Sequence, residues 1–136
     1  MRILMVDDDV VGMGGMLEML QIEGHNVDFA SCQREAWQYL RSADYDVAII
    51  DIMFPYGEVD LQVVVDRSED AGVALLRRIR SGEFGRNAGT RVIVYTAKTT
   101  DPQLPARLVA LGVGDDDLFF KPGKALEIVG RLAGQQ

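Results

Sequence analysis

Carboxylates follow two of the apolar stretches in this sequence. "RILMV" (residues 2–6) runs directly into three aspartates at 7–9, and "VAII" (47–50) runs directly into Asp51. A carboxylate at the end of a buried strand is unfavourable unless a cation or hydrogen-bond donors compensate it. Acids that lie close together repel one another and favour a cation between them. Because the candidate ligands are oxygens, the expected ion is a hard one, Mg²⁺ or Mn²⁺ in its place.

A hydroxyl and an ammonium group follow two further apolar stretches. "RVIVYT" (91–96) ends in Thr96, and "LFF" (118–120) precedes Lys121. Mg²⁺ usually takes one or two carboxylates together with a phosphate oxygen, so this set of groups favours phosphoryl chemistry. A carboxylate can be the nucleophile in such chemistry and form an aspartyl phosphate. Thr96 and Lys121 would hold the transferred oxygens.

These groups can meet only if strands and helices alternate along the chain. We expect strands at 2–6, 25–30, 46–50, 91–96 and 117–120, and helices at 10–23, 33–42, 70–82, 102–112 and 124–133. Such alternation predicts right-handed crossovers and a parallel sheet that is covered on both faces. Ligands bind outside the carboxyl ends of parallel strands, where all of these groups would lie. Val10 and Leu126 are expected among the buried helix residues because they match the helical spacing.

Composition narrows the class of protein. The 136 residues are 48% hydrophobic, which suits one domain over 1–136 with a proper core. The net charge of −7 opposes direct binding to nucleic acid or to anionic membranes. One cysteine and one histidine exclude a disulfide framework and a Cys/His zinc site. No apolar run reaches 18 residues, so we expect a soluble, cytoplasmic chain.

Four stretches together resemble a known family. "ILMVDDD", "DVAIIDIMFP", "VIVYTA" and "LFFKP" are similar, in order and spacing, to the marks of the receiver (CheY-like) domain of two-component response regulators. The resemblance covers residues 2–133. It implies an α/β, flavodoxin-like, doubly wound sheet of five parallel strands in the order 2-1-3-4-5, with five helices.

The resemblance also implies a role for each acid. Asp51 would be the phosphoacceptor for a sensor histidine kinase or a phosphotransfer protein. Asp7, Asp8 and Asp51 would hold Mg²⁺, with the backbone carbonyl of Met53 as a further ligand. The expected protein is a phosphorylation-controlled signalling switch and not an enzyme, beyond limited self-catalysed phosphotransfer and dephosphorylation.

The switch residues match the family only in part. Thr96 and Lys121 would be its switch hydroxyl and its lysine, followed by a Lys-Pro bond that tends to be cis. The family usually has Tyr or Phe three residues before the lysine, where this chain has Leu118. Either Phe119 takes that role by a local shift, or the coupling is absent; Tyr95 points to the opposite face of its strand and is a poor substitute. Gly123 also stands where the family often has Phe.

Other acids have simpler explanations. Asp9 is expected to cap the first helix, where a carboxylate accepts backbone N–H groups. The aspartates at 115–117 are expected to form a solvated turn without chemistry. Cys32 and His25 are expected to be inert.

The connection after Asp51 is longer than the family usually has. It is an insertion-like loop over about 54–70, in which Val59, Leu61, Val63 and Val65 alternate with Asp60, Gln62, Val64 and Asp66. That period of two predicts an extra strand or hairpin arm. Long loops of this kind tend to be functional, so we expect an arm that contacts the kinase or gates phosphate access.

Three functions follow from these observations. The first is a stand-alone receiver domain that passes its signal to a downstream protein target by contact and that can dimerise. Alternatively, this receiver domain is a piece of a longer protein. The second is a pseudo-receiver, a phosphorylation-independent interaction module, which Leu118 and Gly123 favour. The third is an aspartate-based hydrolase or phosphotransferase. Such enzymes need a second acid two residues after the nucleophile, and Met53 stands there instead.

Overall fold

The computed structural model of the chain describes residues 1–54, 70–97 and 101–133. Five strands form one parallel sheet: β1 (Arg2–Val6), β2 (Asn26–Ala30), β3 (Val47–Ile50), β4 (Arg91–Thr96) and β5 (Leu118–Phe120). Five α-helices lie within these ranges: α1 (Val10–Ile22), α2 (Gln33–Ser42), α3 (Ala71–Arg80), α4 (Leu104–Ala110) and α5 (Ala125–Ala133). Two short 3₁₀ helices, η1 (Gly85–Gly89) and η2 (Asp115–Asp117), precede β4 and β5.

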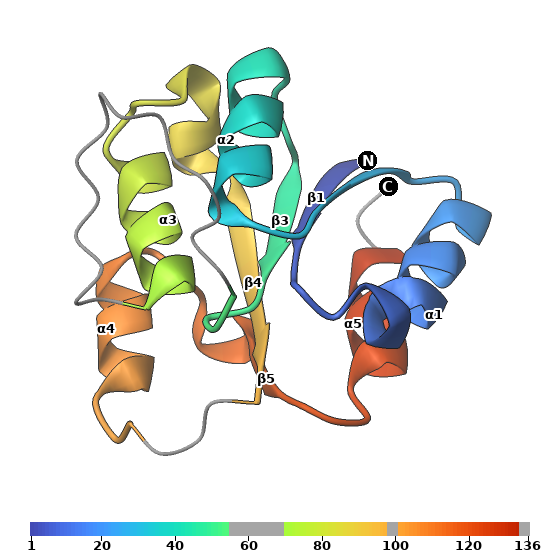
Figure 1. The fold of residues 1–136 in the computed structure, drawn as a ribbon. Helices are drawn as coiled ribbons and strands as arrows, with labels where there is room; N and C mark the ends of the chain where they lie inside the picture. Colours follow the sequence, from blue (N-terminus) through green and yellow to red (C-terminus); the bar gives the residue numbers. More distant parts are fainter. Residues whose placement is uncertain (55–69, 98–100, 134–136) are drawn as a thin grey trace.

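The strands lie side by side in the order β2-β1-β3-β4-β5, and every neighbouring pair is parallel. Helices α1 and α5 cover one face of the sheet, and α2, α3 and α4 cover the other (Figure 1). The predicted doubly wound architecture and its strand order are confirmed. Since all strands run in one direction, their carboxyl ends share one edge of the sheet.

Two apolar clusters, one on each face, hold the layers together. Strand β3 is buried along its whole length, and its residues alternate between the two clusters. Ala48 and Ile50 face α2, α3 and α4, while Val47 and Ile49 face α1 and α5. This two-sided burial is why β3 is a continuous apolar run in the sequence.

Two expected core residues are exposed. Val10 is 56% exposed, because the buried face of α1 begins only at Met13. Leu126 is 75% exposed, because the buried face of α5 is made by Ile128, Val129 and Leu132. Helical spacing alone predicts an apolar face but does not fix which residues at its margins are covered.

The triplet of aspartates before β5 is only partly solvated, which corrects a prediction. Asp117 is buried, and its two carboxylate oxygens accept hydrogen bonds from Arg91 at 3.1 and 2.8 Å. It lies in η2, so β5 begins one residue later than expected. The pair joins the start of β4 to the start of β5, where a buried carboxylate needs a cation.

The predicted strand or hairpin arm, including Val59 to Val65, lies outside the described residues. No helix within the described residues is long and apolar enough to cross a membrane.

Candidate functional site

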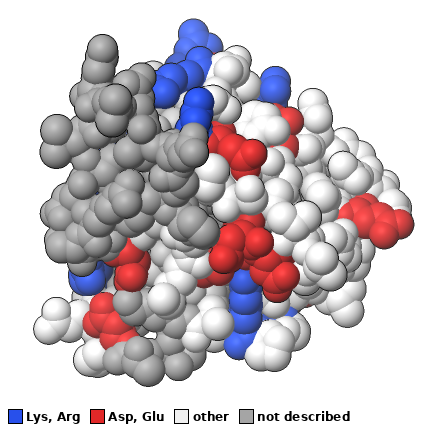
Figure 2. Space-filling model, viewed as in Figure 1, with Lys and Arg blue, Asp and Glu red and all other residues white. Residues whose placement is uncertain are grey.

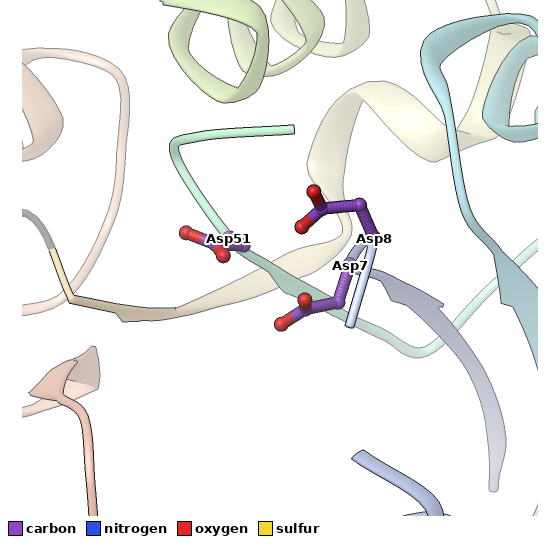
Figure 3. Close-up of side chains that lie close together, drawn as sticks. All are labelled: Asp7, Asp8 and Asp51. Carbon is purple, nitrogen blue, oxygen red and sulfur yellow. The ribbon is translucent and has the colours of Figure 1, made fainter. Parts of the chain in front are cut away.

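Three carboxylates meet at the carboxyl edge of the sheet. Asp7 and Asp8 follow β1, and Asp51 follows the neighbouring β3. One oxygen from each lies within 4.8 Å of the others, and Figure 3 shows the three groups pointing to the same side. On the face drawn in Figure 2, acidic side chains gather beside a basic one near the middle of the view. The arrangement brings together the acids that the sequence placed at the ends of separate strands.

The backbone fixes the position of Asp51. Its N–H donates to Val6 O at 2.9 Å, which extends the pairing of β3 with β1 by one residue. The N–H of Met53 donates to Asp51 Oδ1 at 3.1 Å. Gly72, at the start of α3, donates its N–H to Ile52 O, and a Cβ at that glycine would lie 2.3 Å from Asp51 O. Only glycine therefore lets α3 begin this close to the phosphoacceptor candidate.

Lys121 connects the two buried acids. Its Nζ donates to Asp7 Oδ2 at 2.6 Å and to Asp51 Oδ2 at 3.2 Å. The ammonium reaches them from the end of β5, two strands away from β3. The Lys121–Pro122 peptide bond is cis, in agreement with the expectation from the resemblance.

Burial and neighbouring charges shift the pKa values of Asp7 and Lys121. Burial raises the pKa of Asp7 above its ordinary value, assisted by the charge of Asp51 and opposed by hydrogen bonds from Lys121 and the N–H of Asp9. Burial alone would lower the pKa of Lys121, but the hydrogen bond to Asp7 and the charges of Asp51 and Asp7 raise it instead. The Lys121 ammonium therefore does not offset the burial of Asp7, and a further cation would be favoured here.

The donor set fits Mg²⁺. All ligand candidates are hard oxygens, and Asp8 is exposed while Asp7 and Asp51 are buried, so one side of the group is open to water. Mg²⁺ keeps several waters and takes few protein carboxylates, which this half-open group would allow. The side chain of Met53 is exposed, and its backbone lies beside Asp51 through the hydrogen bond given above.

Thr96 lies at the same edge of the sheet. It is fully buried at the end of β4, and its backbone carbonyl accepts a hydrogen bond from Lys121 N at 2.9 Å. Asp9 does not join the acidic group as a ligand candidate; its Oδ1 caps α1 by accepting from Gly12 N at 2.9 Å.

Neither Leu118 nor Phe119, the two candidates for the switch aromatic position, places an aromatic ring on the Thr96 side of the sheet. Leu118 packs on the α2–α3–α4 face, and Phe119 packs on the α1–α5 face. Strand alternation puts Thr96 on the same face as Val94 and Leu118. Phe119 thus faces away from Thr96, as does Tyr95, which lies in the same cluster as Phe119.

Tyr95 is a residue that sequence reasoning set aside and that the structure puts next to Lys121. Its ring centroid lies 5.6 Å from Lys121 Nζ, and its hydroxyl accepts a hydrogen bond from Lys124 N at 3.2 Å. The available signal was an aromatic residue one position before Thr96, the last residue of a buried strand.

Known proteins match this chain over nearly all of its length. The model of the response regulator receiver domain family matches residues 3–133. Transcriptional regulatory protein PmrA of Pectobacterium parmentieri is 30% identical over 132 residues, which cover 97% of this chain and 50% of that protein. Response regulator GtcR of Aneurinibacillus migulanus is 31% identical over 133 residues, which cover 98% of this chain and 46% of that protein.

Solved structures agree on the fold. A two-component response regulator from Clostridium difficile superposes with a TM-score of 0.75 at 19% identity, covering 98% of this chain and 93% of that one. A CheY-like receiver domain protein from Methanospirillum hungatei JF-1 superposes with a TM-score of 0.73 at 20% identity, covering 98% and 91%.

The chain therefore belongs to the response regulator receiver domain family of two-component signalling. It spans about half the length of the curated relatives it matches. Receiver domains of this family bind Mg²⁺ at a cluster of aspartates and interact with histidine kinases and downstream effectors.

Proposed function

We propose that the chain is a phosphorylation-controlled switch in which Asp51 is the phosphoacceptor. A carboxylate oxygen of Asp51 attacks the phosphorus of a phosphohistidine on a histidine kinase or a phosphotransfer protein. The new O–P bond forms as the P–N bond breaks, and the imidazole leaves. The observation that supports this most directly is Lys121 Nζ, which lies within hydrogen-bond distance of both Asp7 and Asp51.

Each residue of the site has a defined task in this proposal. Asp7, Asp8, Asp51 and the backbone carbonyl of Met53 would hold Mg²⁺. When bound, Mg²⁺ neutralises charge between the carboxylates and the phosphoryl oxygens. The N–H of Met53 holds Asp51 Oδ1, which leaves Oδ2 on the side of Lys121.

Lys121 and Thr96 would bind the new phosphoryl group. Phosphorylation adds nearly two negative charges and three acceptor oxygens at Asp51. The ammonium of Lys121 would turn from the carboxylates toward these oxygens, and the Thr96 hydroxyl would donate to one of them. Movement at the ends of β4 and β5 would then change the surface that a downstream protein target contacts.

A pseudo-receiver is the second candidate, and a specific observation favours it. The aromatic side chain expected to follow the switch hydroxyl is replaced by Leu118, and Phe119 faces the other side of the sheet. In that case the chain would bind its partner in the same way whether or not Asp51 carries a phosphoryl group.

Intact-mass analysis after incubation with acetyl phosphate and Mg²⁺ tests the phosphoacceptor. The wild type is expected to gain the mass of one phosphoryl group, and Asp51→Asn is expected to gain none. Asp44→Asn, which removes an exposed carboxylate before β3, is the matched control and should gain as much as the wild type. An unmodified wild type under these conditions would favour the pseudo-receiver.

A further inference from the structure

Tyr95 occupies an unusual place beside the site. It is the penultimate residue of β4 and is 5% exposed on the face covered by α1 and α5. It packs there with Met13, Phe119 and Ile128. Its side chain therefore lies on the opposite face of the sheet from Thr96, yet its polar end reaches the carboxyl edge.

The tyrosine makes two contacts with the connection from β5 to α5. The hydroxyl Oη accepts a hydrogen bond from the N–H of Lys124 at 3.2 Å. The ring centroid lies 5.6 Å from the ammonium of Lys121, within the range of a cation–π contact of roughly 6 Å. The ring thus lines one side of the ammonium while Asp7 and Asp51 lie within hydrogen-bond distance of it.

Two adjacent residues of β4 hold the two ends of this connection. The carbonyl of Thr96 accepts from Lys121 N at its start, and the hydroxyl of Tyr95 accepts from Lys124 N at its end. The carbonyl of Lys124 in turn accepts from Ile128 N in the first turn of α5. The Tyr95 hydroxyl therefore ties β4 to the point where α5 begins.

The middle of the connection has little packing of its own. Gly123 has φ +89, and a Cβ built there would meet no atom within 4 Å. The residues around it, with Tyr95 and Lys121, line an open pocket between the connection and the first turn of α1. Because Gly123 contributes no side-chain packing, the hydrogen bond from Lys124 N to the Tyr95 hydroxyl is a contact that holds this segment to β4.

We propose that Tyr95 is a positioning residue for Lys121: it fixes the connection from β5 to α5 and so keeps the ammonium against the phosphoacceptor carboxylate. The proposal rests on the function given above and adds a residue to it. Tyr95 acts from the opposite face of the sheet and touches neither Asp51 nor the incoming phosphoryl group.

Tyr95→Phe is the sharpest test because it removes the hydroxyl and keeps the buried ring. The rate of phosphorylation by acetyl phosphate at saturating Mg²⁺ is expected to fall about three- to tenfold, which corresponds to the loss of one ordinary hydrogen bond. The Mg²⁺ concentration for half-maximal rate should stay unchanged, because no metal ligand is altered. Tyr45→Phe is the matched control: it removes a buried hydroxyl that bonds Asp28 near the other edge of the sheet, and the rate should not change.

A double-mutant cycle separates positioning of Lys121 from a general loss of structure. The affinity for beryllofluoride with Mg²⁺, measured by calorimetry, should fall in Tyr95→Phe and fall further in Lys121→Ala. Adding Tyr95→Phe to Lys121→Ala should then have no further effect. An equal loss in both backgrounds, or a Tyr95→Phe variant indistinguishable from wild type, would overturn the inference while the proposed function stood. A wild type that takes up neither phosphoryl group nor beryllofluoride would overturn both.

Discussion

Buried polar groups are paired in opposite ways at the two edges of the sheet: the amino edge, where the strands begin, and the carboxyl edge, where they end. At the amino edge, the side chain of Asn87 is fully buried and makes three hydrogen bonds, to Leu40 O, Ala43 O and Tyr45 N. At the carboxyl edge, two buried carboxylates share one ammonium. Every bond at Asn87 matches one donor to one acceptor, whereas the carboxyl edge has an excess of negative charge.

Further groups at the amino edge follow the same pattern. The hydroxyl of Thr90 donates to Tyr45 O at 2.7 Å. The guanidinium of Arg80 donates to the carbonyls of Leu111, Ala88 and Thr90 at 2.8, 2.9 and 2.6 Å. Matched bonds of this kind fix one arrangement of the backbone. This difference indicates that the amino edge stabilises the fold, while the carboxyl edge has an excess of negative charge that a ligand can neutralise.

Removing Asn87 should have the largest effect on stability. Asn87→Leu removes the side-chain partner of two carbonyls and one N–H at the amino edge, so the free energy of unfolding should fall by about 3 kcal/mol. Urea unfolding measures this value, and Asn26→Leu at an exposed position is the control. Under conditions where Asn87→Leu is still folded, it should be phosphorylated to the same extent as the wild type. A variant that kept its stability but lost phosphorylation would break the division between the two edges.

Removing one charge from the carboxyl edge should stabilise the metal-free protein. Burial raises the pKa of Asp7, so its contribution to stability is full below the unfolded value of 3.8 and is lost as pH rises through the folded pKa. At neutral pH the ionised form therefore disfavours the fold. Asp7→Asn should raise the free energy of unfolding in EDTA by on the order of 1 kcal/mol.

Added Mg²⁺ should make the wild type more stable than Asp7→Asn, the reverse of the order expected in EDTA. The wild type should gain stability by mass action, and Asp7→Asn should gain much less because it has lost a ligand. Thermal unfolding of both proteins with EDTA and with Mg²⁺ measures the two differences. If Asp7→Asn were destabilised in EDTA, the carboxyl edge would be a balanced ion pair and the comparison would fail.

His25, beside the start of β2, should give the smallest effect. Burial lowers its pKa, helped by the charge of the chain's amino group. Its folded pKa thus lies below the unfolded value of 6.5, so stability should be full above pH 6.5 and fall as pH drops through the folded pKa. Urea unfolding from pH 7.5 to 5.5 should show a loss of less than about 1 kcal/mol that is absent in His25→Gln. A loss of equal size in the variant would assign the pH dependence to other groups.

The sheet and the carboxyl-edge group were predictable because both follow from short, local patterns. Strands such as 2–6 and 91–96 are continuous apolar runs, and parallel topology brings their carboxyl ends together whatever the details of packing. The side chains of Asp7, Asp51 and Lys121 therefore meet although up to 114 positions separate them in sequence.

The remaining features depend on packing that no local pattern encodes. Leu126 fits the helical period, but the orientation of α5 on the sheet decides that Ile128 is buried instead. The sequence predicts that Asp117 is a turn residue, because its hydrogen bonds with Arg91 on the neighbouring strand depend on the fold. The functional place of Tyr95 is hidden in the sequence because its contact with Lys124 N depends on the path of the connection that begins directly after β5.

Amide NMR spectra with and without beryllofluoride and Mg²⁺ test the central claim most directly. The account predicts large shifts for the carboxyl edge, at Asp7, Asp51, Thr96 and Lys121, and unchanged positions for the amino edge at Asn87 and Thr90. Spectra that stay unchanged throughout, or that shift as much at Asn87 as at Asp51, would contradict it.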